Sequence, residues 1–275
     1  MDTGSVTTAT PAAHALPASS SFVSPLQPIL GMLAAIRQAQ DAPLGVADGL
    51  IVPPAADGWL PGTAFADGTA IADLLAGPRH RWDALPHASA TLAWKAYAYW
   101  LALPAVLGYT AVRRVPLLHA GNVVVRLSTG KPYVTIGIRR LALAVLPNDP
   151  AAGQPGVRVL PDEDALLDVF RETLVDQHLA PVLHQIRQQA RVGKRPLWGS
   201  LASAVAQGVA KAADTLPVDA VATATQLLDT FGVSDLVDVE RKREGGLAVQ
   251  RRTCCLAFTV SCLKTCSTCC LPAGA

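Results

Sequence analysis

The spacing of apolar residues predicts a mainly helical chain that contains a small sheet. Over most of the length, apolar residues recur at intervals of three and four, which is typical of helices with one buried face. The predicted helices cover 28–40, 68–76, 88–112, 161–178, 181–193, 197–213 and 218–231. Because proline disrupts a helix interior, we expect the third helix to kink or stop near Pro104 and a break between His178 and Pro181.

Strand patterns occur in two places. The β-branched runs 122–127 and 133–138 flank a short polar turn and predict a hairpin, and 141–146 could add a third strand. Residues 236–249, interrupted by two glycines, predict a second hairpin. Residues 41–67 are broken by several prolines and glycines, so we expect an irregular connection there. The predicted fold class is therefore α+β, mainly helical, with a small antiparallel sheet.

The composition indicates a large buried core and gives no sign of a surface that binds nucleic acid. Hydrophobic residues make up 51% of the 275 residues and the net charge is only +2, which argues against a nucleic-acid binder. The uncharged stretch 96–112 is at the short end of what a membrane span needs and contains Pro104. We interpret it as a buried core helix, with contact to a membrane surface left open.

The chain divides into three predicted parts. Residues 1–26, rich in Thr, Ala, Ser and Pro, lack the basic start and apolar core of a secretory signal and predict a flexible tail. Residues 27–250 form the predicted helical α+β domain, and 251–275 form a cysteine-rich segment. Without a signal, the predicted compartment is the cytoplasm, where cysteines serve metal or redox chemistry more often than disulfides.

All six cysteines fall in the last 22 residues. They are Cys254, Cys255, Cys262, Cys266, Cys269 and Cys270. Thiolates gathered on one short segment suit a zinc ion or an iron–sulfur cluster, because soft sulfur ligands must converge on one small object.

Two spacings within this group are disfavoured. Cys262-x3-Cys266-x2-Cys269 matches the triplet of radical S-adenosylmethionine enzymes, but those enzymes place it early and only six residues follow it here. A zinc site would pair Cys266-x2-Cys269 with Cys262 and either Cys254 or Cys255. Adjacent side chains point apart in an extended chain, which makes a vicinal pair a poor half-site.

The spacing Cys254-Cys255-x10-Cys266-x2-Cys269 resembles the C-terminal motif of the FhuF-type ferric-siderophore reductases. The resemblance implies that these four cysteines hold a [2Fe–2S] cluster.

Other segments extend the resemblance over roughly 90–272, through Arg251-Arg252-Thr253 and the Trp198-Gly199 step. Cys262 and Cys270 are extra to the motif and remain candidates for replacement ligands or inert thiols.

The resemblance implies a cytoplasmic reductase that passes one electron to a ferric siderophore, with a hydroxamate type favoured, and releases Fe(II). Hard oxygen ligands hold Fe(III) far better than Fe(II), so one electron makes the complex labile. No glycine pattern forms a dinucleotide fingerprint, so a ferredoxin or an NAD(P)H-dependent reductase must supply the electron. The alternatives are an iron–sulfur electron carrier for another acceptor and a zinc-stabilised siderophore- or iron-binding module.

Several neighbouring residues have two interpretations. Arg251, Arg252 and Lys264 either raise the potential of the cluster or are plain surface charges. Trp94, Tyr97 and Trp100 recur at three-residue intervals on one helix face, where core packing is favoured over a wall of a siderophore pocket. The dispersed histidines are not expected to be ligands, and the acidic run 162–164 suits a helix N-terminus.

Overall fold

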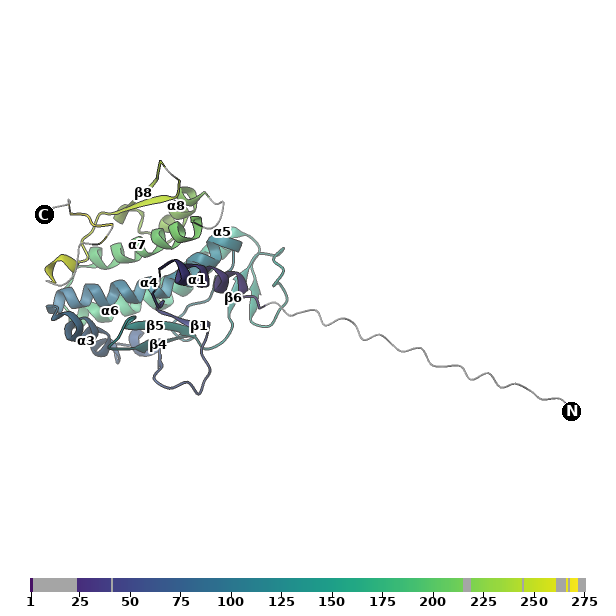
Figure 1. Ribbon diagram of the computed structural model, residues 1–275, viewed down its shortest axis with the longest axis horizontal. Helices are drawn as coiled ribbons and strands as arrows, with labels where there is room; N and C mark the ends of the chain where they lie inside the picture. The colour runs from purple at the N-terminus through teal and green to yellow at the C-terminus, as the bar shows by residue number, and fades with distance from the viewer. Residues whose placement is uncertain are drawn as a thin grey trace.

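Two long helices lie side by side at the centre of the fold (Figure 1). They are α4 (Pro86–Val112) and α7 (Lys194–Ala213). Gly208 allows their close approach, since a Cβ at this position would meet the Val106 side chain at 2.8 Å. Both predicted helices are confirmed.

The computed structural model describes residues 1, 24–40, 42–214, 219–243, 245–260, 266 and 268–271. The remaining helices within these residues pack around the central pair. They are α1 (Gln27–Gln40), α2 (Thr63–Ala66), α3 (Ile71–Trp82), α5 (Glu163–Arg171), the π-helix η1 (Glu172–Leu179), α6 (Ala180–Gln189) and α8 (Ala220–Thr230), with short 3-10 turns η2 (Ser234–Leu236) and η3 (Ala257–Thr259).

The strands form three small sheets. They are β1 (Val46–Ile51), β2 (Leu60–Pro61), β3 (Val115–Pro116), β4 (Val123–Leu127), β5 (Val134–Ile138), β6 (Leu143–Val145), β7 (Val157–Val159), β8 (Val237–Arg241) and β9 (Leu247–Arg251). The sheet orders are β1-β5-β4-β2, β3-β6-β7 and β8-β9. Both predicted hairpins, β4–β5 and β8–β9, are confirmed, and so is the α+β class.

The prediction for 41–67 is wrong, because this segment contains β1, β2 and α2. Strand β1 includes Asp48 and Gly49, which disfavour a strand, and its pairing in parallel with β5 supplies what local propensity lacks. The third predicted strand exists as β6, but it pairs with β3 and β7 in a separate sheet.

Proline does not break the helices where the sequence predicts it. Helix α4 continues through Pro104, and α5, η1 and α6 follow one another without a gap through Pro181. The wider turn of η1 precedes Pro181, and a π-turn accommodates a residue that cannot donate the usual backbone hydrogen bond.

The uncharged stretch of α4 is a core helix, as expected, because most of its side chains are buried. None of the helices in the described part of the chain has the length and apolar character needed to cross a bilayer. Most of the predicted tail, residues 2–23, lies outside the described residues. Leu26, at its end, is buried in the main core.

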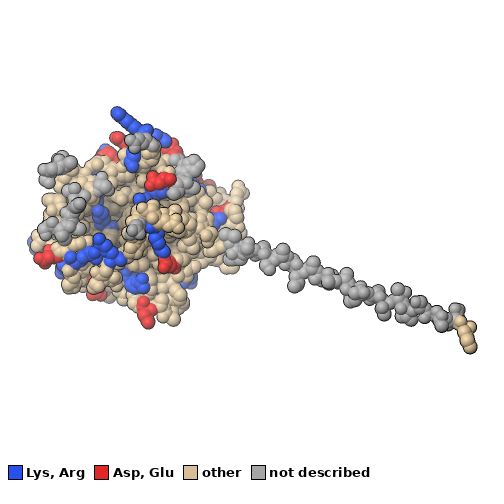
Figure 2. Space-filling view, viewed as in Figure 1, with Lys and Arg blue, Asp and Glu red and all other residues tan. Residues whose placement is uncertain are grey.

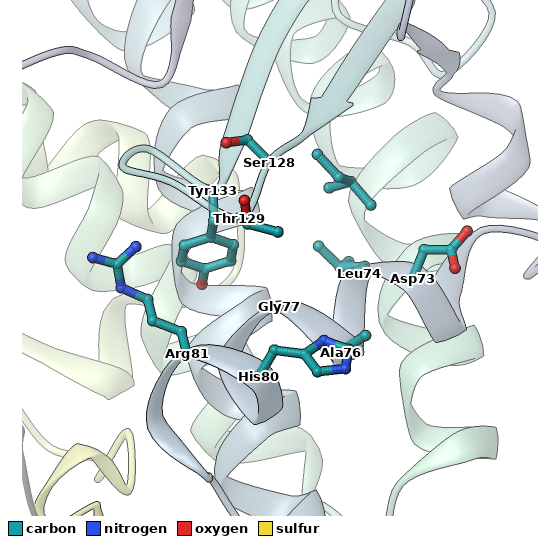
Figure 3. Close-up of a pocket in the computed structure, with 10 residues that line it drawn as sticks. Asp73, Leu74, Ala76, Gly77, His80, Arg81, Ser128, Thr129 and Tyr133 are labelled. Atoms are coloured by element: carbon teal, nitrogen blue, oxygen red, sulfur yellow. The ribbon is translucent and has the colours of Figure 1, made fainter.

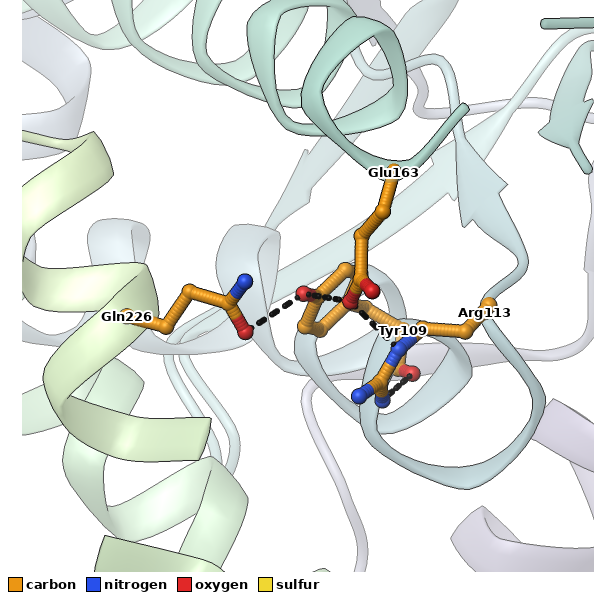
Figure 4. A network of polar contacts seen from close by, with 4 residues as sticks. All are labelled: Tyr109, Arg113, Glu163 and Gln226. Atoms are coloured by element: carbon orange, nitrogen blue, oxygen red, sulfur yellow. Dashed lines mark hydrogen bonds and ion pairs between the residues drawn. The ribbon is translucent and has the colours of Figure 1, made fainter. Parts of the chain in front are cut away.

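The acidic run at 162–164 is a helix N-terminus, as predicted. Asp162 caps α5 by accepting a backbone hydrogen bond at 2.8 Å. Glu163 accepts hydrogen bonds from the Tyr109 hydroxyl at 2.6 Å and from Arg113 at 2.7 Å (Figure 4). Gln226 of α8 lies 2.9 Å from the same hydroxyl, so this network joins α4, α5 and α8 far from the cysteines in sequence.

Candidate functional site

The first cysteines pack on the N-terminal half of α4. Cys255 belongs to a small apolar cluster, separate from the main core, that includes Ala88 and Leu92 of α4 and Val260. The Thr91 hydroxyl lies 2.9 Å from the Cys255 carbonyl oxygen, which fixes the backbone of the segment to the helix. The described C-terminal residues therefore lie at one end of the molecule (Figure 1).

The start of α7 holds the residues just before the cysteines. A Cβ on Gly199 would overlap the Thr253 side chain, so only glycine permits this approach. Trp198 packs edge-on against Trp94 of α4, with ring centroids 6.5 Å apart. Trp94 also donates from Nε1 to the Leu197 carbonyl at 2.7 Å. Trp198 and Gly199 thus allow α4, α7 and the cysteine segment to pack against one another.

The structure brings one pair of predicted ligands together. Cys255 Sγ and Cys266 Sγ are 4.0 Å apart. A turn relates Cys269 to Cys266, since the Cys269 amide donates to the Cys266 carbonyl at 3.0 Å. The described residues contain no group of three or more His, Cys, Asp or Glu side chains already arranged to hold a metal ion. Cys262 lies outside the described residues.

Backbone amides point at two of the sulfurs. The Leu256 amide donates to Cys254 Sγ at 3.3 Å, and the Leu271 amide donates to Cys269 Sγ at 3.4 Å. Hydrogen bonds of this kind stabilise negative charge on sulfur and are one means by which a protein tunes an iron–sulfur cluster. The five cysteines in the described part of the chain are free thiols.

Two neighbouring thiols differ in acidity. The hydrogen bond from Cys255, with help from Lys95 and Arg251, lowers the pKa of Cys266 to about 6. The same hydrogen bond and burial raise the pKa of Cys255. Cys266 is therefore a thiolate at neutral pH, and the thiolate is the form that binds metal.

Arg251 is a buried cation beside these thiols. Its side chain is 2% exposed, and Nη2 donates to the Ser200 hydroxyl at 3.0 Å. Nε and Nη1 have no hydrogen-bond partner among the described residues. Arg252, by contrast, is exposed and ion-paired with Asp238, and Lys264 lies outside the described residues.

These observations fit an iron–sulfur cluster. A buried guanidinium requires negative charge nearby, and the four thiolate ligands of a cluster would supply it. Cys254, Cys255, Cys266 and Cys269 would hold the cluster, which when bound supplies one electron at a time.

The aromatic residues of α4 divide between the core and a pocket. Trp94 and Tyr97 are fully buried, which confirms core packing as their role. Tyr99, which is not one of the three aromatic residues of the predicted face, lines a pocket together with Lys95 and Tyr133. The sequence could have pointed to Tyr99, because it lies on the same helix as the three predicted aromatic residues. Tyr133 could not be found in this way, because only the tertiary fold brings it close to Tyr99.

His178 is a structural residue. It is fully buried, its Nδ1 lies 2.7 Å from the Leu118 carbonyl, and its Nε2 lies 2.7 Å from the Tyr97 hydroxyl. Because a carbonyl only accepts, Nδ1 carries the proton and Tyr97 donates to Nε2. Burial lowers the pKa of His178 to about 4, so the ring is neutral.

Charged side chains on the surface are interspersed. Figure 2 shows basic side chains separated by uncharged and acidic surface on the face in view. Several exposed arginines pair with aspartates, among them Arg195 with Asp235 and Arg241 with Asp219.

A comparison with models of protein families finds one match. The family model described as ferric iron reductase FhuF-like transporter matches residues 92–231, just over half of the chain. The chain belongs to this family. The FhuF-like match begins in α4 and ends after α8, so the cysteines from Cys254 onward lie beyond it. No curated protein matches the chain.

Proposed function

We propose that this FhuF-like protein is a ferric-siderophore reductase that holds a [2Fe–2S] cluster. Cys254, Cys255, Cys266 and Cys269 are the proposed ligands, on a segment spanning 251–275. The substrate is a ferric siderophore, with a hydroxamate type favoured, in which Fe(III) gains one electron and leaves as Fe(II). A separate ferredoxin or NAD(P)H-dependent reductase supplies the electron, and the compartment is the cytoplasm.

Family membership supports the reductase activity, which needs a centre that carries an electron, and the buried Arg251 beside the thiols supports a negatively charged metal–thiolate centre there. An uncompensated cation at this position would cost several kcal/mol, and metal-bound thiolates beside it would offset that cost. The sulfur-directed amides at Cys254 and Cys269 are consistent with two of the proposed ligands.

The cluster is tested by purifying the full chain without oxygen and measuring iron, acid-labile sulfide, visible absorption and the electron paramagnetic resonance signal after reduction. We expect a coloured protein with a [2Fe–2S] signal. Cys266→Ser and Cys269→Ser should each lose or alter this signal, whereas the matched variant Cys270→Ser should retain it. A colourless, well-folded protein that contains zinc would contradict the cluster.

The activity is tested by adding a chemically reduced ferredoxin and a ferric trihydroxamate in the presence of an Fe(II)-specific dye. Stoichiometric Fe(II) release that requires the cluster supports the proposal. A cluster that is reduced but does not react with any ferric complex would indicate an electron carrier for another acceptor. Rapid bleaching by NAD(P)H alone would remove the need for a separate donor.

A further inference from the structure

Two of the proposed ligands touch each other although they are 11 positions apart in the sequence. Cys255 Sγ and Cys266 Sγ are 4.0 Å apart. Both lie at the same small apolar cluster: Cys255 is one of its buried members, and Cys266 packs against it. A disulfide bond is about 2.05 Å long, so the two sulfurs need to approach each other by about 2 Å. Rotation of the two side chains can supply a movement of this size.

The neighbouring thiols have partners of their own. Cys254 Sγ accepts a hydrogen bond from the Leu256 amide at 3.3 Å, and Cys269 Sγ accepts one from the Leu271 amide at 3.4 Å. Cys270 has Cys254 as a hydrogen-bonding neighbour. The described part of the chain therefore presents Cys255 and Cys266 to each other, with Cys254 and Cys270 as the competing pair.

The two sulfurs in contact differ in their access to small molecules. Cys255 is 3% exposed, whereas Cys266 lines a pocket of about 360 Å³ together with Tyr99 and Tyr133. Tyr133 also lines a second pocket, of about 290 Å³, between α3 and the β4–β5 turn, and that pocket has no cysteine in its lining (Figure 3). Of these two pockets, only the one beside Cys266 therefore gives a small oxidant a path to a thiol.

We propose that Cys255 and Cys266 are a covalent modification site, which a peroxide converts to a disulfide whenever no metal is bound to these two thiols. Cys266 reacts first, because the pocket exposes it, and the buried Cys255 then closes the bond. The disulfide needs no cluster to form, whereas its effect on cluster assembly rests on the proposed function. It blocks two of the four proposed ligands and protects them from oxidation to sulfinic acids, which thiol reductants do not reverse.

The reaction balances in two steps. The Cys266 thiolate attacks hydrogen peroxide, the O–O bond breaks, and a sulfenic acid and a hydroxide ion form. The Cys255 thiol then attacks the sulfenic sulfur, so that the S–S bond forms, the S–O bond breaks and water leaves. The two sulfurs lose two electrons in total, and the peroxide oxygens gain them. A dithiol reductant reverses the modification by returning two electrons and two protons.

The test treats the full chain with one equivalent of hydrogen peroxide after a chelator has removed any metal without oxygen. The remaining thiols are then blocked, and trypsin, which cuts after Arg252 and Lys264, places the two cysteines on the peptides 253–264 and 265–275. We expect these peptides to be linked, and tandem mass spectrometry to assign the link to Cys255 and Cys266. A main product that joins Cys266 to another cysteine, or Cys254 to Cys270, overturns the proposal.

Three variants test the order of attack. Cys270→Ser is the matched control and should give the link between Cys255 and Cys266 in unchanged yield. With a 1,3-diketone present during the reaction, Cys255→Ser should accumulate the trapped sulfenic acid at Cys266, whereas Cys266→Ser should leave Cys255 unmodified. Equal trapping at Cys255 in Cys266→Ser overturns the order of attack and the role of the pocket in it.

Protein purified without oxygen separates this proposal from the proposed function. If it carries the cluster, we expect the link to form only as the visible absorption of the cluster is lost. A cluster that is lost while the two cysteines stay unlinked overturns the disulfide and leaves the proposed function standing. A protein that carries no metal, and forms the link as fast as the chelator-treated protein, supports the disulfide and overturns the proposed function.

Discussion

The Arg251 guanidinium donates a hydrogen bond to the Ser200 hydroxyl at 3.0 Å, which joins the end of β9 to the first turns of α7. The rest of this guanidinium has no partner among the described residues. One buried cation is therefore oriented by a helix of the family-matched region and placed beside the cysteines that lie outside that region.

Arg251→Met should shift the reduction potential of the cluster to a more negative value, because the reduced cluster loses a nearby positive charge. A redox titration followed by electron paramagnetic resonance measures this shift. In the cluster-free protein the same change should leave the free energy of unfolding unchanged or raise it, since an unpaired buried charge is removed.

Arg252→Met is the matched control for this prediction. Arg252 is exposed and paired with Asp238, so its loss should move the potential little and cost less than about 1 kcal/mol in stability. Equal shifts in potential for the two variants would contradict a special role for Arg251.

The burial of His178 predicts that the free energy of unfolding depends on pH. Its pKa is about 4 in the folded protein and about 6.5 in the unfolded chain, so between these values only the unfolded chain binds the proton. Stability should therefore fall as the pH is lowered from 6.5 to 4, by about 3 kcal/mol at most, and should not depend on this group above pH 6.5.

Chemical denaturation at several pH values measures this effect. His178→Gln should flatten the pH dependence in that window, although the variant is less stable overall because its packing and its bonds to Tyr97 and Leu118 change. His184→Gln, on the exposed face of α6, should keep the slope of the unmodified protein. A slope that survives in His178→Gln would assign the effect to other groups.

Thr91 and Thr110 offer a comparison within one helix. The Thr91 hydroxyl contacts the Cys255 carbonyl at 2.9 Å, whereas the buried Thr110 hydroxyl has no partner among the described residues. Thr91→Val should cost about 1–3 kcal/mol and speed the loss of the cluster, since it leaves a buried carbonyl unpaired. Thr110→Val should be neutral or stabilising by about 1 kcal/mol, because it removes a buried hydroxyl without a partner.

Unfolding free energies and the rate of bleaching in air measure both changes. Bleaching at the same rate in the two variants would show that Thr91 does not hold the cysteine segment on α4.

The sequence predicts those parts of the fold whose pattern is local. The hairpin of β4 and β5 follows from its β-branched runs, and α7 follows from its helical spacing. Strand β1 and the continuous helix through Pro181 could not be predicted, because a distant partner strand and a π-turn decide them.

The same division holds for the site. The spacing of the cysteines predicts a metal-binding segment, but it says nothing of Arg251 being buried while its neighbour Arg252 is paired at the surface. Residues 133 and 266 lie far apart in the sequence, so the pocket that they share depends on the tertiary fold.

Gly199→Ala tests whether the approach of α7 to Thr253 is required. A methyl group at 199 would overlap the Thr253 side chain, so we expect a cost of about 1–3 kcal/mol and weaker retention of the cluster. Gly31→Ala in α1 is the matched control. No atom lies within 4 Å of a Cβ built at Gly31, so this change should stabilise the protein by about 0.5–1 kcal/mol through helix propensity alone.

The double variant Gly199→Ala with Thr253→Ala should recover part of the loss, because the smaller side chain removes the overlap with Oγ1. Thermal unfolding measures stability, and iron content after gel filtration measures retention. If Gly199→Ala instead gains stability as Gly31→Ala does, the close packing of α7 on the cysteine segment does not position the site.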